Sequence, residues 1–384
     1  MQYVDLGGGK ALAVVGDRGT LLQLVNRATS FSSSLGPAMK KAMVPLLSAL
    51  PEKPEGQRPI LYACENDHEA VKRVGASVKG KVDCVPCMVD RICTGRSILD
   101  EAVNVEAEPT FSGEIVVLSP PEDHELVPFK GEHVVLPRNK LEAEYFYQRK
   151  FSIVNGMHTV LAFLTLRQTD ASAQECRDYD LLTYDTATPA LKKQIWAWIS
   201  LRCLMLIHKY GLDMLKEAHG VSSEEAVFDV MLGYARQTLK RFSSITDSTS
   251  RVLGGGVGNR WATRLRPVVQ FMQDHQYKGT GTPEERFLLH AGVDEDYARD
   301  MATRLMLDSL QFCTKEVQSC VKGLVEYYKF YNRAGFPVRE IVEGELPPEA
   351  ASPHQPVQPD EDGAVPGRAP APAPVAPEPV SAKA

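Results

Sequence analysis

The sequence lacks the features that would mark a nucleic-acid-binding, membrane or secreted protein. Its net charge is −6, from 43 lysines and arginines against 49 aspartates and glutamates, so the chain as a whole attracts neither nucleic acid nor anionic lipid. No apolar run approaches the roughly 18 to 20 residues that a membrane helix needs. The N-terminus MQYVDLGGGKALAVVG shows no basic region, apolar stretch and cleavage site in succession, so we expect no secretory signal and, by default, a cytoplasmic protein.

Cysteine is also sparse, with eight residues scattered over a chain of 384. A chain of this length can bury a large core without a disulfide framework, so we expect reduced thiols. Cys84 and Cys87 have C-x-x-C spacing, and Cys93 lies nearby. A zinc site would need a second cysteine pair or a histidine pair at matching spacing, and the sequence shows neither. We therefore expect no metal.

Two regions of different character follow one another along the chain. Up to about residue 140, strand-like stretches, glycine turns and helical stretches alternate, in the order that predicts a parallel α/β sheet. The expected elements there are a helix over TLLQLVNRA, a strand over ATSFSS, a helix over PAMKKAMVPLLSAL, a buried strand over RPILYACEN and further strands within 113–136. We predict domains at 1–140 and 141–340.

The second region reads as a series of amphipathic helices separated by glycine and proline. The predicted helical stretches are 141–168, 187–218, 223–243, 259–276, 284–293 and 296–333. Beyond them, residues 341–384 are rich in proline and alanine and hold almost nothing that could be buried. We predict that they form a disordered tail.

The stretch RKFSIVNGMHTVLAFL places three polar residues in an otherwise apolar helix. At about 100° per residue, His158 lies about 80° and Asn155 about 140° from Lys150, so all three share one side. The apolar side chains cluster near the direction of Lys150 itself. Burial of an ammonium group lowers its pKa toward the range that is useful for proton transfer. Alternatively, the lysine can extend to water and the other two can form hydrogen bonds in a core without any chemistry.

Four motifs in order resemble the polyol-specific long-chain dehydrogenases, the family of mannitol dehydrogenase and mannitol-1-phosphate 5-dehydrogenase. LGPAMKKAMVPLL resembles the V-G-P turn and helix of this family, PILYACEN its strand end I-I-A-C-E-N, and PCMVDRI its A-V-D-R-I segment. EYFYQRKFSIVNGMHTVLAFL is similar to its helix R-K-L-x-x-x-N-x-x-H-x-x-x-A-Y-L, which contains K-x4-N-x2-H. The resemblance extends over roughly residues 1 to 335.

The resemblance implies a role for each matched polar residue. Lys150 falls on the catalytic lysine, which takes the proton of a secondary alcohol without a metal while hydride leaves for the nicotinamide. Asn155 and Asn66 fall on the asparagines that hydrogen-bond the reacting oxygen and hold the lysine. His158 falls on the histidine that binds substrate hydroxyls, and Asp90 falls on a carboxylate near the substrate.

Further candidates come from two weaker matches. RVLGGGVGNRWATRLRP resembles an arginine-containing substrate segment of the family loosely, which makes Arg251 and Arg260 candidates for substrate contact. A flexible loop followed by a helix with solvated arginines would look the same. Gly36, Glu65 and Asn66, in the motifs that match the nucleotide domain, are candidates for cofactor contact.

The G-x-G-x-x-G loop that should hold the cofactor pyrophosphate is missing from the sequence. The run 7–9 is glycine but lacks a preceding strand, and the resemblance places residues 1 to 36 late in the first domain of the family. We therefore expect the first strand, loop, helix and strand of that domain to have no counterpart here, and the same gap would hide any targeting peptide. Either the chain is a shortened form of a complete oxidoreductase, or it is a cofactor-deficient relative that acts as a binding or structural protein. A purely helical scaffold would leave the set of Lys150, Asn66 and Asp90 without a role.

The sequence therefore predicts an incomplete Rossmann-like parallel sheet followed by a mostly helical domain, an α/β plus all-α fold. The expected activity is the interconversion of a polyol or polyol phosphate and its ketose with NAD or NADP. Mannitol and fructose, or mannitol 1-phosphate and fructose 6-phosphate, are the expected pairs, and NGMHTVLAF is closer to the mannitol type. A phosphorylated substrate would need further cations, which Arg260, Arg264 and Arg266 could supply. The sequence predicts no oligomeric state and does not choose between the two cofactors.

Overall fold

The computed structural model describes residues 3–5, 11–13, 18–99, 102–108, 113–169, 179–254 and 256–313. The chain divides into two units, 1–349 and 350–384, and every described residue belongs to the first. The predicted tail over 341–384, the glycine run 7–9 and the end of the last predicted helical stretch lie outside the described residues.

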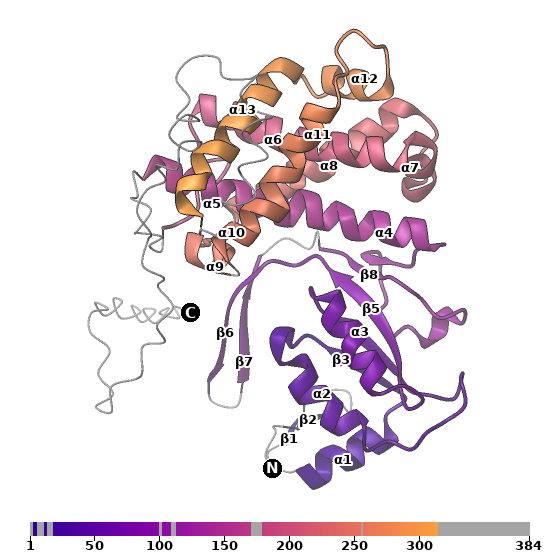
Figure 1. The fold of residues 1–384 in the computed structure, drawn as a ribbon. Helices are drawn as coiled ribbons and strands as arrows, with labels where there is room; N and C mark the ends of the chain where they lie inside the picture. The colour runs from indigo at the N-terminus through magenta and orange to yellow at the C-terminus, as the bar shows by residue number, and fades with distance from the viewer. Residues whose placement is uncertain are drawn as a thin grey trace, which may run out of the picture. The chain divides into compact units, whose positions relative to one another are not determined.

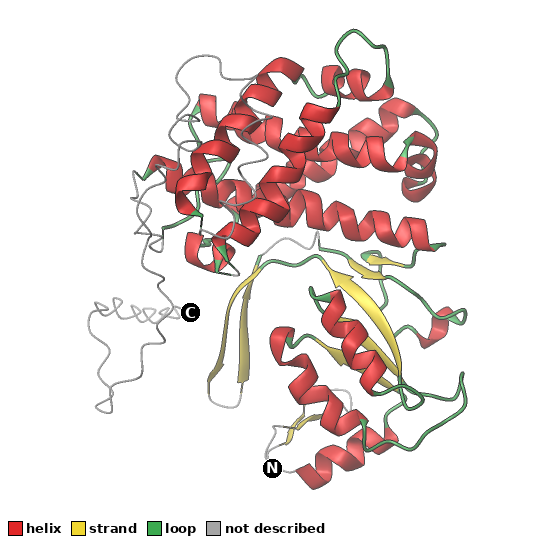
Figure 2. Ribbon diagram, in the orientation of Figure 1, coloured by secondary structure: helices red, strands yellow, loops and turns green. Residues whose placement is uncertain are grey.

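The N-terminal region contains a five-stranded, mostly parallel sheet (Figures 1 and 2). Its strands, in spatial order, are β3 (Ser30–Ser33), β4 (Ile60–Cys64), β5 (Asp83–Val89), β8 (Ile115–Val117) and β9 (Val134–Val135). The first three are parallel, β8 runs antiparallel to β5, and β9 is parallel to β8. The predicted parallel sheet is thus confirmed in this coarse form, with one reversed pairing that the sequence did not indicate.

Helices and short hairpins accompany this sheet. The helices are α1 (Arg18–Arg27), α2 (Met39–Leu47) after the 3-10 turn η1 (Gly36–Ala38), and α3 (His68–Ser77); η2 (His124–Leu126) is a further 3-10 turn. The hairpins pair β1 (Tyr3–Asp5) with β2 (Ala11–Ala13) and β6 (Cys93–Leu99) with β7 (Ala102–Ala107). The predicted N-terminal helices and strands are confirmed, whereas the hairpin of β6 and β7 was not predicted.

Both faces of the parallel strands are covered, which explains the continuous apolar run in β4. Leu61 and Ala63 belong to one core cluster together with side chains of α2 and α3, and Tyr62 belongs to a second cluster on the other face. The same alternation separates the two cysteines of the C-x-x-C pair, since Cys84 packs against the first cluster and Cys87 lies in the second. Within the described ranges, no group of three or more His, Cys, Asp and Glu side chains could hold a metal ion.

From residue 140 onward the described chain is mostly helical. Its helices are α4 (Lys140–Arg149), the π-helical turn η3 (Lys150–Asn155), α5 (Gly156–Gln168), α6 (Pro189–Tyr210), α7 (Leu212–His219), α8 (Glu224–Ser243), α9 (Thr249–Leu253), α10 (Val257–Arg260), the π-helical turn η4 (Trp261–Leu265), α11 (Arg266–Asp274), α12 (Pro283–His290), α13 (Glu295–Asp308) and the 3-10 turn η5 (Ser309–Phe312). They confirm the predicted helical stretches as far as residue 313.

Local sequence signals set where these helices begin. Thr188, Ser223 and Asp294 each accept a hydrogen bond from a backbone N–H of the first turn of α6, α8 and α13. The 22-residue helix α6 is buried over most of its length from Ile195 to Ile207 and contacts α4, α5, α8, α11, α12 and α13, so it is the centre of the helical core. That core also includes Met88 and Val116 from the sheet. None of the described helices has the length and apolar character that crossing a membrane requires.

Candidate functional site

Three of the predicted site segments follow the carboxyl ends of adjacent parallel strands. Gly36 comes shortly after β3, Asn66 after β4, and Asp90 directly after β5. Carboxyl ends of parallel strands lie at one edge of a sheet, and open α/β sheets bind their ligands at this edge. The sheet thereby presents segments from distant parts of the sequence on one side.

Lys150 lies at the point where α4 passes through a π-helical turn into α5. In this turn the N–H of Gly156 donates to the carbonyl oxygen of Phe151, five residues earlier. Turns of this kind are rare, and single ones inside helices are frequent at functional sites. The wider turn also reduces the angle between Lys150 and Asn155 from the roughly 140° expected for a regular helix.

The ammonium group of Lys150 is buried and faces a neutral partner. The residue is only 6% exposed, and its Nζ donates to Oδ1 of Asn66 at 2.7 Å. Burial lowers the pKa of Lys150, and the nearby charges of Arg264 and Arg241 lower it further, while Asp90 opposes them. The structure therefore brings two of the predicted catalytic residues together, although they are 84 positions apart in the sequence.

Asp90 belongs to a buried ionic network. Its carboxylate accepts hydrogen bonds from Nη1 of Arg241 at 2.9 Å and from the hydroxyl of Tyr234 at 2.7 Å. Arg241 also pairs with Glu108 at 2.8 Å. Burial alone would raise the pKa of Asp90, but the bonds from Arg241 and Tyr234 hold it below its usual range. Asp90 thus acts on Lys150 through its charge, and its predicted contact with substrate stays a prediction.

His158 and Arg251 meet at one carboxylate, that of Asp247. Nε2 of His158 lies 2.7 Å from Oδ2 of Asp247, and the ring stacks on Phe242 with 4.5 Å between centroids. Arg251 forms an ion pair with the same carboxylate. Burial lowers the pKa of His158, and Asp247 opposes this shift. With the proton of a neutral ring on Nε2, Nδ1 is left as a hydrogen-bond acceptor, which suits a substrate hydroxyl.

Arg264 reaches the Lys150 turn from the second π-helical turn, η4. Its Nη1 donates to the carbonyl oxygen of Phe151 at 2.9 Å, and its guanidinium carbon lies 3.5 Å from the centroid of the Phe151 ring. Arg260, at the end of α10, is half-buried. Burial lowers the pKa of Arg264 to about 10, and the charge of Arg260 contributes to the shift. Within the described residues, neither Nε atom has a hydrogen-bond partner.

Two of the predicted cofactor residues bind each other. The carboxylate of Glu65 accepts the N–H groups of Leu35 at 2.8 Å and of Gly36 at 2.7 Å. Gly36 has φ +56°, a left-handed conformation that favours glycine. Glu65, 6% exposed, therefore fastens the β3–α2 loop to the end of β4 and occupies the backbone donors that an anion would use there.

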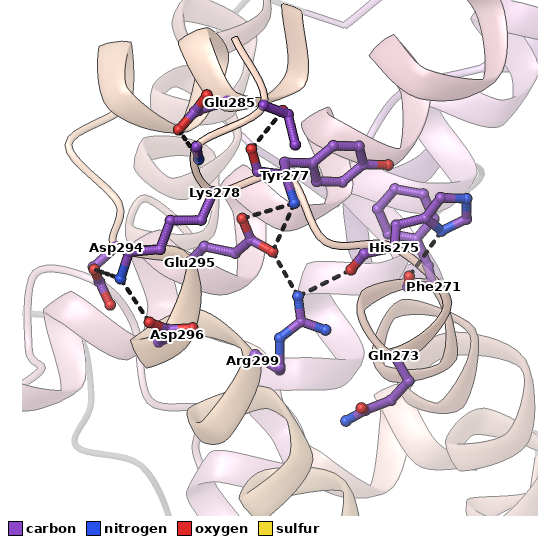
Figure 3. Close-up of polar contacts among 12 residues, drawn as sticks. Phe271, Gln273, His275, Tyr277, Lys278, Glu285, Asp294, Glu295, Asp296 and Arg299 are labelled. Carbon is purple, nitrogen blue, oxygen red and sulfur yellow. Dashed lines mark hydrogen bonds and ion pairs between the residues drawn. The ribbon is translucent and has the colours of Figure 1, made fainter. Parts of the chain in front are cut away.

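A second polar cluster, between α11 and α13, stabilises the connection that follows α11 (Figure 3). Glu295 accepts the backbone N–H of Tyr277 and the guanidinium of Arg299, which also donates to the carbonyl oxygen of His275 at 2.9 Å. Its charged groups satisfy one another and hold the connection that follows α11.

Sequence reasoning missed three side chains of the Lys150 region, Tyr234, Arg241 and Asp247, and it named Arg264 only as a cation that could bind a substrate phosphate. A signal existed for the first two, which are seven residues apart on one face of α8 and lie among buried apolar residues. Polar groups on an apolar face were the signal that singled out Lys150. Asp247 precedes a short helix in a polar segment and had no comparable signal.

Comparison of the sequence with models of known protein families and with curated proteins finds no match in either set. The chemistry of the site is therefore what bears on function.

Proposed function

We propose that the chain is an NAD(P)-dependent oxidoreductase that interconverts a polyol or polyol phosphate and its ketose, with Lys150 as general acid/base. The observation that carries the proposal is a buried lysine whose amine faces the amide of Asn66 instead of a carboxylate. A lysine in an ion pair would be held in its protonated form, whereas burial and the neighbouring arginines lower the pKa of this one, which favours the release of its proton. The ordered motifs that resemble mannitol dehydrogenase and mannitol-1-phosphate 5-dehydrogenase support the same assignment.

In the proposed reaction the neutral amine of Lys150 accepts the proton of a secondary hydroxyl. A nicotinamide bound at this edge would supply the acceptor for the hydride that leaves the same carbon, so that the alcohol would become a ketone. In the reverse direction the protonated amine returns the proton to the developing alkoxide. The amides of Asn66 and Asn155 can polarise the reacting oxygen without adding a charge beside a lysine that must lose its proton.

The described residues fit only part of a nicotinamide cofactor. The carboxyl edge of the parallel strands, where Asn66 and Lys150 meet, is where the reactive end of a dinucleotide would lie. The backbone donors of Leu35 and Gly36 are taken by Glu65, and no glycine-rich pyrophosphate loop occurs among the described residues. This second observation favours the alternative function, a cofactor-deficient binding protein of the same family.

Arg251 and Arg260 differ in the kind of substrate group that each could bind. Arg251 is neutralised by Asp247, which suits uncharged hydroxyls. Arg260 has no carboxylate partner within the described part of the chain and would suit a phosphate. Polyol and polyol phosphate therefore both remain within the proposal.

The decisive experiment measures cofactor binding and turnover of the full chain. NADH and NADPH are titrated by fluorescence, and activity is assayed with mannitol, mannitol 1-phosphate, fructose and fructose 6-phosphate. We expect turnover that Lys150→Met abolishes with circular dichroism unchanged. Lys209→Met, an exposed lysine on α6, is the matched control and should retain activity. Absence of both binding and turnover would leave the binding-protein alternative, and turnover that survives Lys150→Met would refute the assigned base.

A further inference from the structure

We propose that Arg264 is a positioning residue for Lys150, holding the turn that carries the lysine in its π-helical form, with Arg202 as its support. The role in catalysis rests on the proposed function, whereas the structural link does not. Two π-helical turns, η3 and η4, are joined by the hydrogen bond from Arg264 to Phe151, and η4 also packs against α5. Such turns make up well under about 1% of residues in globular proteins, so two in direct contact need a cause.

The contact fixes both the backbone and the side chain of the residue next to Lys150. The carbonyl oxygen of Phe151 already accepts the N–H of Gly156, and Arg264 supplies a second donor at 2.9 Å. A carbonyl oxygen has two lone pairs, so both bonds can form at once. The guanidinium also lies over the Phe151 ring, an electrostatic attraction that is stronger where water is excluded. Rotation of this turn would break both interactions.

Arg202, from α6, binds the backbone of Arg264. Its Nη2 donates to the backbone carbonyl oxygen of Arg264 at 2.7 Å, and the side chain is only 2% exposed. Its guanidinium also fills the space beside Gly156, where an added Cβ would lie 2.3 Å from Nη1. Arg202 therefore contacts the first residue of α5 and the backbone of η4 together. Glycine at position 156 is what allows this approach.

The arrangement also sets the charge around the lysine. The charged and titratable groups that act on Lys150 are Asp90 from the end of β5, Arg241 from α8 and Arg264 from η4, and His68 of α3 feels the lysine in turn. Burial lowers the pKa of Lys150 first, the two arginines add to this, and Asp90 opposes it. Burial also lowers the pKa of His68, which therefore adds little positive charge at neutral pH. Removing the charge of Arg264 must raise the pKa of Lys150.

The test separates charge from geometry with two substitutions. Arg264→Gln removes the charge, and Arg264→Lys keeps the charge but loses the planar group that stacks and donates in a fixed direction. The pKa of Lys150 is read without activity, by NMR of lysine labelled at Cε, with the signal assigned from Lys150→Met. Arg304→Gln, an exposed arginine on α13, is the matched control.

We expect Arg264→Gln to raise the pKa of Lys150 and to shift the rise of kcat/KM for alcohol oxidation upward by the same amount. Arg264→Lys should leave the NMR pKa low while kcat falls about 10- to 100-fold. An unchanged pKa and pH profile in Arg264→Gln overturns the proposal. A wild-type chain without turnover counts against the proposed function alone, because the NMR result still decides the link to Arg264.

If Arg264→Gln does not fold, Phe151→Leu keeps apolar bulk at the contact and removes the ring below the guanidinium. A loss of kcat with little change in KM is then expected, together with an altered NMR signal of Lys150. Wild-type kcat and an unchanged signal in Phe151→Leu would overturn the proposal.

Discussion

The buried pair of Asp90 and Arg241 gives the sharpest test of how the site is held together. Asp90 is 1% exposed and accepts the guanidinium of Arg241 at 2.9 and 3.1 Å and the hydroxyl of Tyr234 at 2.7 Å. Asp90→Asn removes the charge and turns one acceptor into a donor that faces the guanidinium. We expect a loss of about 3 kcal/mol in the free energy of unfolding, the lower end for a broken buried pair, because Glu108 still neutralises Arg241.

Substitutions of the two partners of Asp90 should change the free energy of unfolding by different amounts. Tyr234→Phe removes one hydrogen bond to a charged acceptor and should cost about 1.5 to 2 kcal/mol. Arg241→Met leaves the carboxylates of Asp90 and Glu108 buried without a cation, so it should cost about 5 kcal/mol, the most of the three. The predicted loss of unfolding free energy therefore increases from Tyr234→Phe to Asp90→Asn to Arg241→Met.

Urea unfolding at pH 7, followed by tryptophan fluorescence and circular dichroism, measures these differences. Glu69→Gln is the control, since its ion pair with Lys72 joins side chains that are 68% and 73% exposed and should change stability by less than about 0.5 kcal/mol. If Arg241→Met proved the mildest of the three, charge pairing would not be what holds this network. The pKa of Asp90 is held low, so its contribution should fade as the pH falls below about 3.8.

Three further predictions concern packing, thiol reactivity and acid stability. Gly156→Ala should lower the melting temperature, because the added Cβ would lie 2.3 Å from the buried guanidinium of Arg202. Gly233→Ala on α8 should raise the melting temperature, because its Cβ would meet nothing within 4 Å and alanine has the higher helix propensity. Iodoacetamide at pH 7.5 should modify Cys64 before Cys84, which mass spectrometry can show. A hydrogen bond from a neighbouring thiol lowers the pKa of Cys64 to about 7, whereas burial raises the pKa of Cys84 to about 11. Equal rates of modification would contradict this. Burial would raise the pKa of Asp247, but its arginine and histidine partners hold it well below the ordinary 3.8. Asp247→Asn should therefore lower stability to urea equally at pH 7 and pH 5, and the loss should begin to shrink only as the pH falls below about 3.8. A loss that already shrinks between pH 7 and pH 5 would refute this.

Local patterns predicted the elements of this chain well, because they depend on residues close together. The helix over 141–168, the strand over 60–64 and the position of Lys150 near a buried face all came from periodicity. The π-helical form of the turn did not, because Arg264, which holds it, lies 113 residues further along. The reversed pairing of β8 with β5 depends likewise on which distant strands meet.

The candidate site likewise contains some contacts that the sequence predicted and others that depend on tertiary packing. Lys150 and Asn66 were paired through the resemblance and lie in contact, but the partners of Asp90 and His158 were not predicted. A lone charged residue such as Arg241 or Asp247 is compatible with a solvated surface, and only tertiary packing decides that it is buried. Glu65 and Gly36 show the converse, since both were assigned to a ligand and are found bonded to each other.

The distribution of charge around Lys150 supports its proposed role as a base. The described region holds four buried cations close to the lysine turn: Arg149, Arg202, Arg241 and Arg264. The acidic side chains Asp90 and Glu108 both pair with Arg241. None of this negative charge bonds directly to Lys150, whose hydrogen-bond acceptor is a neutral amide. A structural lysine at this depth would require a carboxylate partner, because an unpaired buried ammonium costs several kcal/mol. Burial and the neighbouring arginines lower the pKa of Lys150, and release of its proton would avoid that cost, which is the property that the proposed general-base role requires.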